Sequence, residues 1–220
     1  MKILIVAGGF LPAKKYGGPV VSIDNLCSLL KDEAEMYVIA DDHDNGESKR
    51  LEGIKEGWNQ RSNCSVYYLK PQEVQKDTLM KIYDDISPDL IYINSFFDYS
   101  LTVPFLKIAK QRNCKVLLAP RGQLCAGAFK KKFKKIPYIV ALQVLELLKN
   151  VHYQSTSDEE TAAIQKWLGA HEDQVHFLTN IPSIPDEGSF QKTEKKPGSA
   201  RLIYISRIVE KKNLLYAIEC

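Results

Sequence analysis

The chain has 220 residues, of which 45% are apolar and 26% are charged, and its formal net charge at pH 7 is +3. This composition is typical of a soluble globular protein, and the charge is too mild to indicate a nucleic-acid partner. The five cysteines lack C-x-x-C spacing, so we predict reduced thiols in a cytoplasmic protein and no metal site. One lysine followed by a short apolar run makes neither a signal peptide nor a membrane span.

The first 30 residues have the pattern of a strand, a glycine loop and a helix. The apolar run at 3–7 predicts a strand buried on both faces of a parallel sheet. Glycine lets the backbone approach an anion, and a helix N-terminus offers unpaired N–H groups. We therefore interpret Gly17 and Gly18, at the start of the predicted helix, as a candidate phosphate site. The alternative, that they only start the helix, stays open because no G-x-G-x-x-G spacing is present.

Strands and helices alternate along the chain that follows. We predict strands at 35–40, 65–70, 90–94, 115–119, 151–155 and 175–178. We predict helices at 72–86, 99–112 and 136–149, and a further helix that ends at about 168. The polar stretch 41–63 is predicted to be a long loop. This order predicts an α/β, Rossmann-like fold with a doubly wound, mainly parallel sheet and helices on both faces. Ligands of such sheets bind beyond the carboxyl ends of the strands, where the glycine pair, Asn94 and Arg121 all fall.

Two basic segments are candidates for anion binding. Arg121 follows a predicted strand and precedes a glycine, so it can present a bidentate donor at the sheet edge, and a surface arginine in a turn is the alternative. The segment Lys130–Lys135 has five lysines around Phe133, ahead of an apolar-rich helix. Such a cationic collar fits an anionic membrane or an anionic acceptor, and a solvated charge run is the alternative.

The segment 151–160 carries two local signals. Ser157 and Glu160 have the spacing of a capping box, and this structural role is sufficient to explain both residues. His152 lies in a predicted strand without a second histidine or cysteine at metal-ligand spacing, so we interpret it as packed or hydrogen-bonded at the strand end.

The composition changes after residue 181. The stretch 182–200 is rich in proline, glycine and charge, which is typical of a linker. A strand is predicted at 201–205 and a helix from 213 onward. We therefore expect an N-terminal domain at 1–181, a linker at 182–200 and the truncated start of a second domain at 201–220, either disordered or paired with another surface.

The order of motifs resembles the N-terminal domain of a retaining family 4 glycosyltransferase with the GT-B fold. The resemblance rests on PAKKYGGP (12–19), PRGQL (120–124), HYQSTSDEE (152–160), TNIP (179–182) and ISRIVEKKN (205–213), which together span nearly the whole chain. Each motif alone is weak evidence for the family, but the order and spacing of the five motifs together are specific. Ser206 and Asn213 depart from the family, which often has glycine at both positions.

The resemblance implies roles for residues on both sides of a cleft. Arg207 and Lys212 match residues that hold the donor's diphosphate, and the glycine pair Gly17 and Gly18 matches a loop on the other side of the donor. Arg121 matches a basic residue that lines the reaction centre near the acceptor. Asn94 and Asp98 are further acceptor-side candidates.

The implied activity is transfer of a sugar, with retention, from a nucleotide-diphosphate sugar to a glycan or lipid-linked acceptor in cell-surface polysaccharide synthesis. The departing phosphate can take the acceptor's proton, so the resemblance requires no resident cofactor and no general base. The expected location is cytoplasmic, including the inner face of a membrane. We expect the 220 residues alone to be inactive, since the family's paired C-terminal glutamates are absent from them.

Two alternatives stay open. One is another GT-B enzyme, such as a nucleotide-sugar epimerase, which would use acidic and histidine residues as proton carriers. The other is a non-catalytic Rossmann-like binding module, to which the missing dinucleotide fingerprint gives little support.

Overall fold

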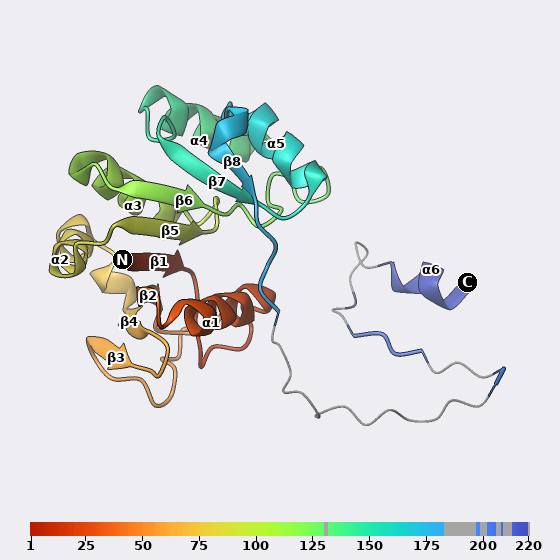
Figure 1. Cartoon of the computed structure of the whole chain (residues 1–220), viewed down its shortest axis with the longest axis horizontal. Coiled ribbons are helices and arrows are strands. Elements are labelled where there is room, and N and C mark those ends of the chain that lie inside the picture. The colour runs from red at the N-terminus through yellow and green to blue at the C-terminus, as the bar shows by residue number, and fades with distance from the viewer. Residues whose placement is uncertain (130–131, 183–196, 199–201, 206–207, 209–212, 220) are drawn as a thin grey trace. The chain divides into compact units, whose positions relative to one another are not determined.

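The computed structural model describes the chain except residues 130–131, 183–196, 199–201, 206–207, 209–212 and 220 (Figure 1). The chain divides into two compact units, Met1–Ser183 and Ile184–Cys220. In the second unit, the described residues include helix α6 (Leu214–Glu219), whose large apolar side chains are exposed. The predicted strand at 201–205 is not confirmed, because residues 202–205 are exposed and unassigned to any strand. The predicted domain boundaries stay a prediction.

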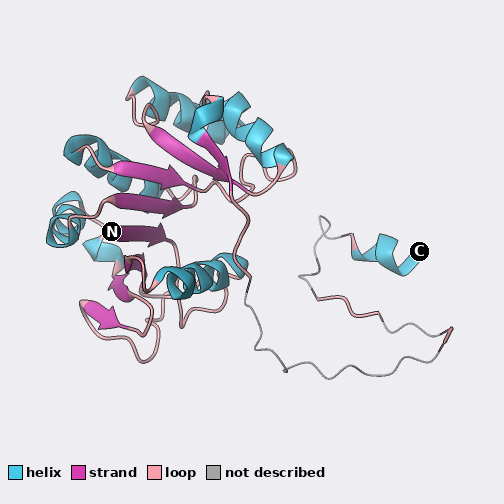
Figure 2. Cartoon of the chain, viewed as in Figure 1, coloured by secondary structure: helices cyan, strands magenta, loops and turns pink. Residues whose placement is uncertain are grey.

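The first unit is built on one eight-stranded sheet (Figure 2). Its strands are β1 (Lys2–Ala7), β2 (Glu35–Asp41), β3 (Trp58–Gln60), β4 (Ser65–Leu69), β5 (Leu90–Asn94), β6 (Lys115–Leu118), β7 (Val151–Ser155) and β8 (Val175–Phe177). The strand order is β3-β4-β2-β1-β5-β6-β7-β8, and every pairing is parallel except β3 with β4. The predicted Rossmann-like α/β fold is therefore confirmed.

The helices cover the two faces of the sheet unequally. They are α1 (Gly18–Leu30), α2 (Lys76–Ile86), α3 (Tyr99–Arg112), α4 (Lys132–Val144) and α5 (Asp158–Leu168). On one face, Ile3 and Ile5 of β1 join Ile23 and Cys27 of α1 in a buried cluster. On the other face, Leu4 and its neighbours pack in a larger cluster with residues of α2, α3, α4 and α5. Alternation of side chains along the strands thus divides the core into two layers.

The long loop predicted at 41–63 has more structure than its polarity indicated. It contains β3 and an isolated bridge between His43 and Arg50. Trp58 forms β3 because its indole packs edge-on against Tyr37 and Tyr67, at centroid distances of 5.5 and 5.4 Å. Aromatic pairing across strands stabilises such an edge addition.

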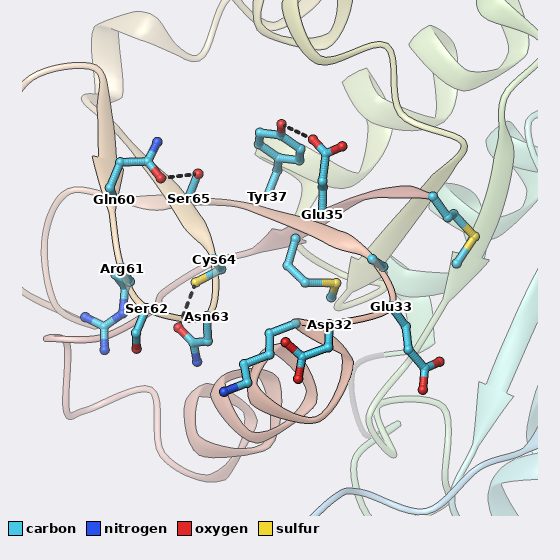
Figure 3. Close-up of a pocket in the computed structure, with 14 residues that line it drawn as sticks. Asp32, Glu33, Glu35, Tyr37, Gln60, Arg61, Ser62, Asn63, Cys64 and Ser65 are labelled. Atoms are coloured by element: carbon cyan, nitrogen blue, oxygen red, sulfur yellow. Dashed lines mark hydrogen bonds between the residues drawn. The ribbon is translucent and has the colours of Figure 1, made fainter.

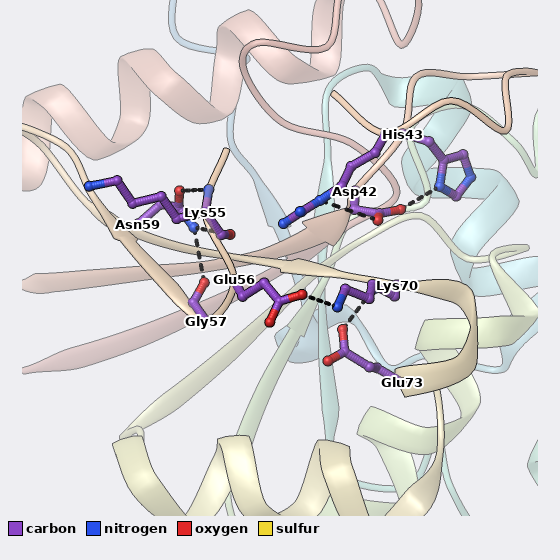
Figure 4. A network of polar contacts seen from close by, with 9 residues as sticks. Asp42, His43, Lys55, Glu56, Gly57, Asn59, Lys70 and Glu73 are labelled. Atoms are coloured by element: carbon purple, nitrogen blue, oxygen red, sulfur yellow. Dashed lines mark hydrogen bonds and ion pairs between the residues drawn. The ribbon is translucent and has the colours of Figure 1, made fainter. Parts of the chain in front are cut away.

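Ion pairs and amide contacts fix the rest of this loop (Figure 4). Asp42 accepts from the His43 ring at 3.0 Å and lies 3.8 Å from Arg50. The Lys70 ammonium contacts Glu56, and the Lys70 N–H donates to Glu73 at 2.8 Å. The Lys70–Glu56 contact connects the loop to the end of β4.

Two predicted helices differ from the observed ones. The helix predicted at 72–86 begins as a 3₁₀ turn, Pro71–Glu73, and α2 starts only at Lys76. The helix predicted at 136–149 is α4, shifted toward the N-terminus at 132–144. It ends early because Glu146 has a left-handed backbone, with a φ of 52°.

Candidate functional site

The glycine pair at the start of α1 has an open setting. Gly17 has a φ of 75° and a ψ of −143°, a conformation that favours glycine. A Cβ at Gly17 or Gly18 would meet no atom within 4 Å. The first turn of α1 has no side-chain cap and no acidic residue. This open setting would allow an anion to approach the helix N-terminus. The backbone conformation of Gly17 is by itself a sufficient reason for glycine at this position. The phosphate-binding role therefore stays a prediction.

Tyr16 closes the glycine loop onto the sheet. Its hydroxyl donates to Asp41 Oδ2 at 3.0 Å, and its ring lies directly against Gly9. A Cβ built at Gly8 would lie 3.2 Å from the Tyr16 ring and 3.4 Å from Asp98 Oδ2. The structure therefore places the predicted Asp98 beside the glycine loop, with Tyr16 and Asp41 as neighbours that were not predicted as site residues.

The Asp41 carboxyl group is poised to exchange a proton near neutral pH. Burial raises its pKa to about 6, partly offset by the Tyr16 hydrogen bond, and the charge of Asp98 raises it further. The pKa of Tyr16 is also raised, mainly by burial and then by the charge of Asp41. A carboxyl group of this kind in a site is a candidate general acid or base.

Asp41→Asn should stabilise the fold at alkaline pH. Because the folded pKa of about 6 exceeds the ordinary value of 3.8, the stabilisation from Asp41 is complete below pH 3.8 and is lost as pH rises through about 6. We expect the free energy of unfolding of Asp41→Asn, relative to wild type, to be higher at pH 8 than at pH 4 by about 1–2 kcal/mol after discounting for partial exposure. Urea unfolding of wild type and Asp41→Asn at both pH values measures this. The same difference in the free energy of unfolding at pH 4 and at pH 8 would contradict the prediction.

Arg121 forms the centre of the second half of the site. Its Nε donates to Asn94 Oδ1 at 3.0 Å and its Nη2 to the Tyr92 hydroxyl at 3.0 Å, while Nη1 contacts Asn180 Oδ1. Arg121 has a left-handed φ of 56°, which turns its side chain back over the end of β5. Among the described residues, Arg121 forms no ion pair, so its partners are neutral oxygens.

Asn94 contributes an unused donor to this centre. The residue is 6% exposed, and its amide nitrogen has no hydrogen-bond partner among the residues that the structure describes. Buried polar groups are almost always paired, so an unpaired buried N–H beside a cation is a feature that a ligand oxygen can satisfy. The predicted acceptor-side pair Asn94 and Arg121 is thus brought into direct contact.

Glu160 binds the backbone of the loop that carries Arg121. Its buried carboxylate accepts the Gly122 N–H at 2.6 Å, and the N–H and hydroxyl of Thr156 at 2.9 and 2.7 Å. Ser157 does cap α5, accepting the Glu160 N–H at 3.2 Å, but the Glu160 side chain does not return to Ser157. The capping box is therefore only half formed, because Glu160 instead joins β7 and α5 to the loop that carries Arg121.

Gln123 fixes the neighbouring loop after β5. Its Oε1 accepts the N–H groups of Phe96 and Phe97 at 2.8 and 3.1 Å. The motif PRGQL thus supplies one cation for the site and one amide that holds the 95–98 loop. Arg121 is a predicted site residue, whereas the role of Gln123 was not predicted.

Two of the cavities among the described residues lie at different places on the sheet. One of about 320 Å³ is mainly apolar and is lined by Arg121, Tyr92 and Gln154 together with leucines of α1 and of the sheet. The other, of about 450 Å³, lies at the amino-terminal ends of the strands, between the start of β2 and the turn before β4 (Figure 3). Only the first contains a predicted site residue, so it is the cavity that the site can use.

His152 has a partner that the sequence did not reveal. Its Nδ1 lies 2.9 Å from Nε2 of His176 on the neighbouring strand β8, and the two exposed rings stack at 5.1 Å. The predicted hydrogen bond of His152 is confirmed, and its partner lies 24 residues away in the sequence because β7 and β8 pair side by side. Within the described residues, no group of three or more metal-ligand side chains is present.

Comparison with known proteins shows the fold and no family. No family model matches the chain, and no curated protein matches it. A UDP-GlcNAc 2-epimerase from Methanocaldococcus jannaschii is 12% identical, with 82% of this chain and 46% of that chain covered and a TM-score of 0.50. The same enzyme from Neisseria meningitidis, bound to UDP-GlcNAc, is 12% identical over 80% and 45% of the two chains, with a TM-score of 0.46.

A third solved structure, dTDP-glucose 4,6-dehydratase from Bacillus anthracis in complex with NAD, is 11% identical over 70% of this chain and 54% of that chain, with a TM-score of 0.44. The chain spans about half the length of these proteins. At such identities the first match shows a shared Rossmann-like fold alone. The resemblance to retaining family 4 glycosyltransferases stays a prediction.

Proposed function

We propose that the chain is the acceptor-side half of an enzyme that acts on a nucleotide-diphosphate sugar and transfers the sugar, with retention, to a glycan or lipid-linked acceptor. The observation that supports this best is the Arg121 centre. A guanidinium with only neutral described partners, beside an unpaired buried amide of Asn94, suits an anionic or hydroxyl-rich ligand at the carboxyl edge of the sheet.

Each residue has a role in this proposal. Arg121 binds an anionic group of donor or acceptor, Asn94 donates to a ligand oxygen, and Asp98 accepts from an acceptor hydroxyl. The main-chain N–H groups at Gly17 and Gly18 face the donor's phosphates. Arg207 and Lys212, proposed to hold the diphosphate, lie outside the described residues.

Epimerisation of a nucleotide sugar is the second candidate, because the chain shares its fold with an enzyme of that activity and because one carboxyl group suits proton transfer. The chain shares its fold with a UDP-GlcNAc 2-epimerase over 82% of its length. The Asp41 carboxyl group, with a pKa raised to about 6 beside Tyr16 and Asp98, supplies the proton carrier that such chemistry needs.

The two candidates differ in what they do to the sugar. In D₂O, an epimerase that removes and returns a proton at the inverted carbon incorporates deuterium into UDP-GlcNAc without any acceptor. A transferase leaves the sugar's C–H bonds intact and needs an acceptor for turnover. Mass spectrometry of recovered UDP-GlcNAc distinguishes them, and Asp41→Asn should abolish any incorporation.

Arg121→Gln should weaken binding of nucleotide sugars by about tenfold, since it removes a charged hydrogen-bond donor and keeps a polar side chain of similar reach. Calorimetric titration of UDP and UDP-GlcNAc into the 220-residue chain measures this. Arg112→Gln, on the exposed surface of α3 and paired with Asp84 at 2.6 Å, is the matched control and should bind as wild type does. Absence of any binding of UDP, GDP or their sugars, both by the folded 220-residue chain and by a folded chain extended through a complete second domain, would reject both candidates and leave a non-catalytic Rossmann-like module.

A further inference from the structure

Helix α4 is apolar on two opposite faces. Its inner face packs on the sheet through Ile139 and Leu142, which are 3% and 2% exposed. Its outward-facing apolar side chains follow one another at intervals of three or four residues: Phe133, Ile136, Val140 and Val144, with exposed fractions of 74%, 37%, 48% and 76%. With 3.6 residues per turn, this spacing aligns them in one stripe on the side opposite the core. We call these four residues the outer stripe.

The charges before and along the outer stripe are positive, and the first acidic residue, Glu146, follows the end of the stripe. Between Tyr99 and Leu145 the sequence has ten lysines and arginines and no aspartate or glutamate. Five of these cations fall between 130 and 135, at the start of α4. Lys130 and Lys131 lie outside the described residues, as does the side chain of Lys132, while Lys134 is exposed beside the outer stripe. The helix therefore begins in a cluster of positive charge.

Contacts with the 95–98 loop hold the start of α4 in place. The Lys135 ammonium lies 4.4 Å from the Phe97 ring centroid, and the pKa of Lys135 is lowered by burial. The Tyr138 hydroxyl donates to the Phe96 carbonyl at 3.1 Å, and its ring meets Tyr99 edge-on at 4.5 Å. Because this loop directly follows β5, the outer stripe is fixed beside the same edge of the sheet as Asn94.

We propose that the outer stripe of α4 docks on an anionic membrane surface, with the helix axis parallel to the bilayer plane. Within the described residues, no helix has the length and apolarity to cross a bilayer, and α4 with 13 residues is about 20 Å long. An interfacial helix needs an exposed apolar face flanked by lysines, and α4 has both. The positive cluster selects an anionic lipid surface over a neutral one. This inference deepens the proposed use of a lipid-linked acceptor, but its test does not depend on it.

Co-sedimentation of the 220-residue chain with vesicles tests the proposal. We expect binding to vesicles of phosphatidylcholine with one-third phosphatidylglycerol and at least tenfold weaker binding to pure phosphatidylcholine. Val140→Asp with Val144→Asp should reduce binding to the anionic vesicles by more than tenfold, since two negative charges replace two apolar contacts. Lys134→Gln should reduce it by about fivefold.

Leu29→Asp is the matched control, because Leu29 is 59% exposed on α1. It should bind as wild type does, and circular dichroism should report the same helix content for all variants. Failure of the folded wild type to bind anionic vesicles, or equal binding by the Val140→Asp/Val144→Asp variant, would overturn the proposal. So would a concentration-dependent dimer that this variant abolishes without any vesicle binding, because a second copy of the chain would then cover the stripe. The vesicles contain no nucleotide sugar or acceptor, so the outcome is separate from that of the proposed function.

Discussion

Glu160→Ala is expected to lower the free energy of unfolding by about 3–4 kcal/mol. The Glu160 carboxylate is 1% exposed and accepts three hydrogen bonds from Gly122 and Thr156. Truncation leaves these part-buried donors without a partner, and the loss of a charge-assisted acceptor is more harmful than the loss of a neutral one. Urea unfolding followed by circular dichroism measures the change.

Glu159→Ala is the matched control for this prediction. Glu159 is the preceding residue in the first turn of α5, and its side chain is exposed. Its removal should change the free energy of unfolding by less than about 0.5 kcal/mol. Because Glu160 holds the loop that carries Arg121, Glu160→Ala should also weaken nucleotide-sugar binding in any fraction that remains folded. Similar stabilities for the two variants would show that the Glu160 contacts contribute little.

Gly9→Ala is expected to destabilise the fold by about 2–3 kcal/mol through overpacking. A Cβ at this position would lie 2.1 Å from Cδ2 of Tyr16, far inside contact distance. The φ of Gly9 is not in the left-handed region, so the backbone itself accepts alanine and the effect is steric. The Tyr16 ring would have to leave its place and break its hydrogen bond to Asp41.

A double-mutant cycle isolates this contact. In a Tyr16→Ala background the space next to Gly9 is empty, and Gly9→Ala should then change the free energy of unfolding by less than about 1 kcal/mol. Gly18→Ala is the control glycine, since its Cβ would meet no atom within 4 Å, and it should be neutral or slightly stabilising. An equal effect of Gly9→Ala in both backgrounds would exclude the clash with Tyr16 as its cause.

The sequence was sufficient for the framework of the fold. Strands such as β1 and β5 are continuous apolar runs, because both of their faces are buried, and their ends could be read to within a residue. The prediction that Asn94 and Arg121 share one edge followed from the same pattern, since parallel strands align their carboxyl ends. Their direct contact at 3.0 Å confirms that prediction.

The parts that the sequence did not reveal depend on contacts between distant residues. The three-residue spacing from Ser157 predicted that Glu160 caps a helix. Its carboxylate instead binds the N–H of Gly122, 38 residues away. Tyr16 and Asp41 lie 25 residues apart and meet only because the glycine loop folds back onto β2. The proximity of His152 and His176 likewise depends on which strands are neighbours in the sheet. The periodicity of apolar residues indicates whether a residue lies in a helix or a strand, and it gives no information on partners that are distant in the sequence.

The position of β1 in the sheet has a consequence for synthesis of the protein. Strand β1 lies between β2 and β5, whose residues at 35–41 and 90–94 are made later. The almost entirely apolar β1 segment therefore keeps one edge unpaired until β5 has been translated. Such an interval exposes nascent chains to aggregation, and we expect holdase chaperones to contact this segment during translation.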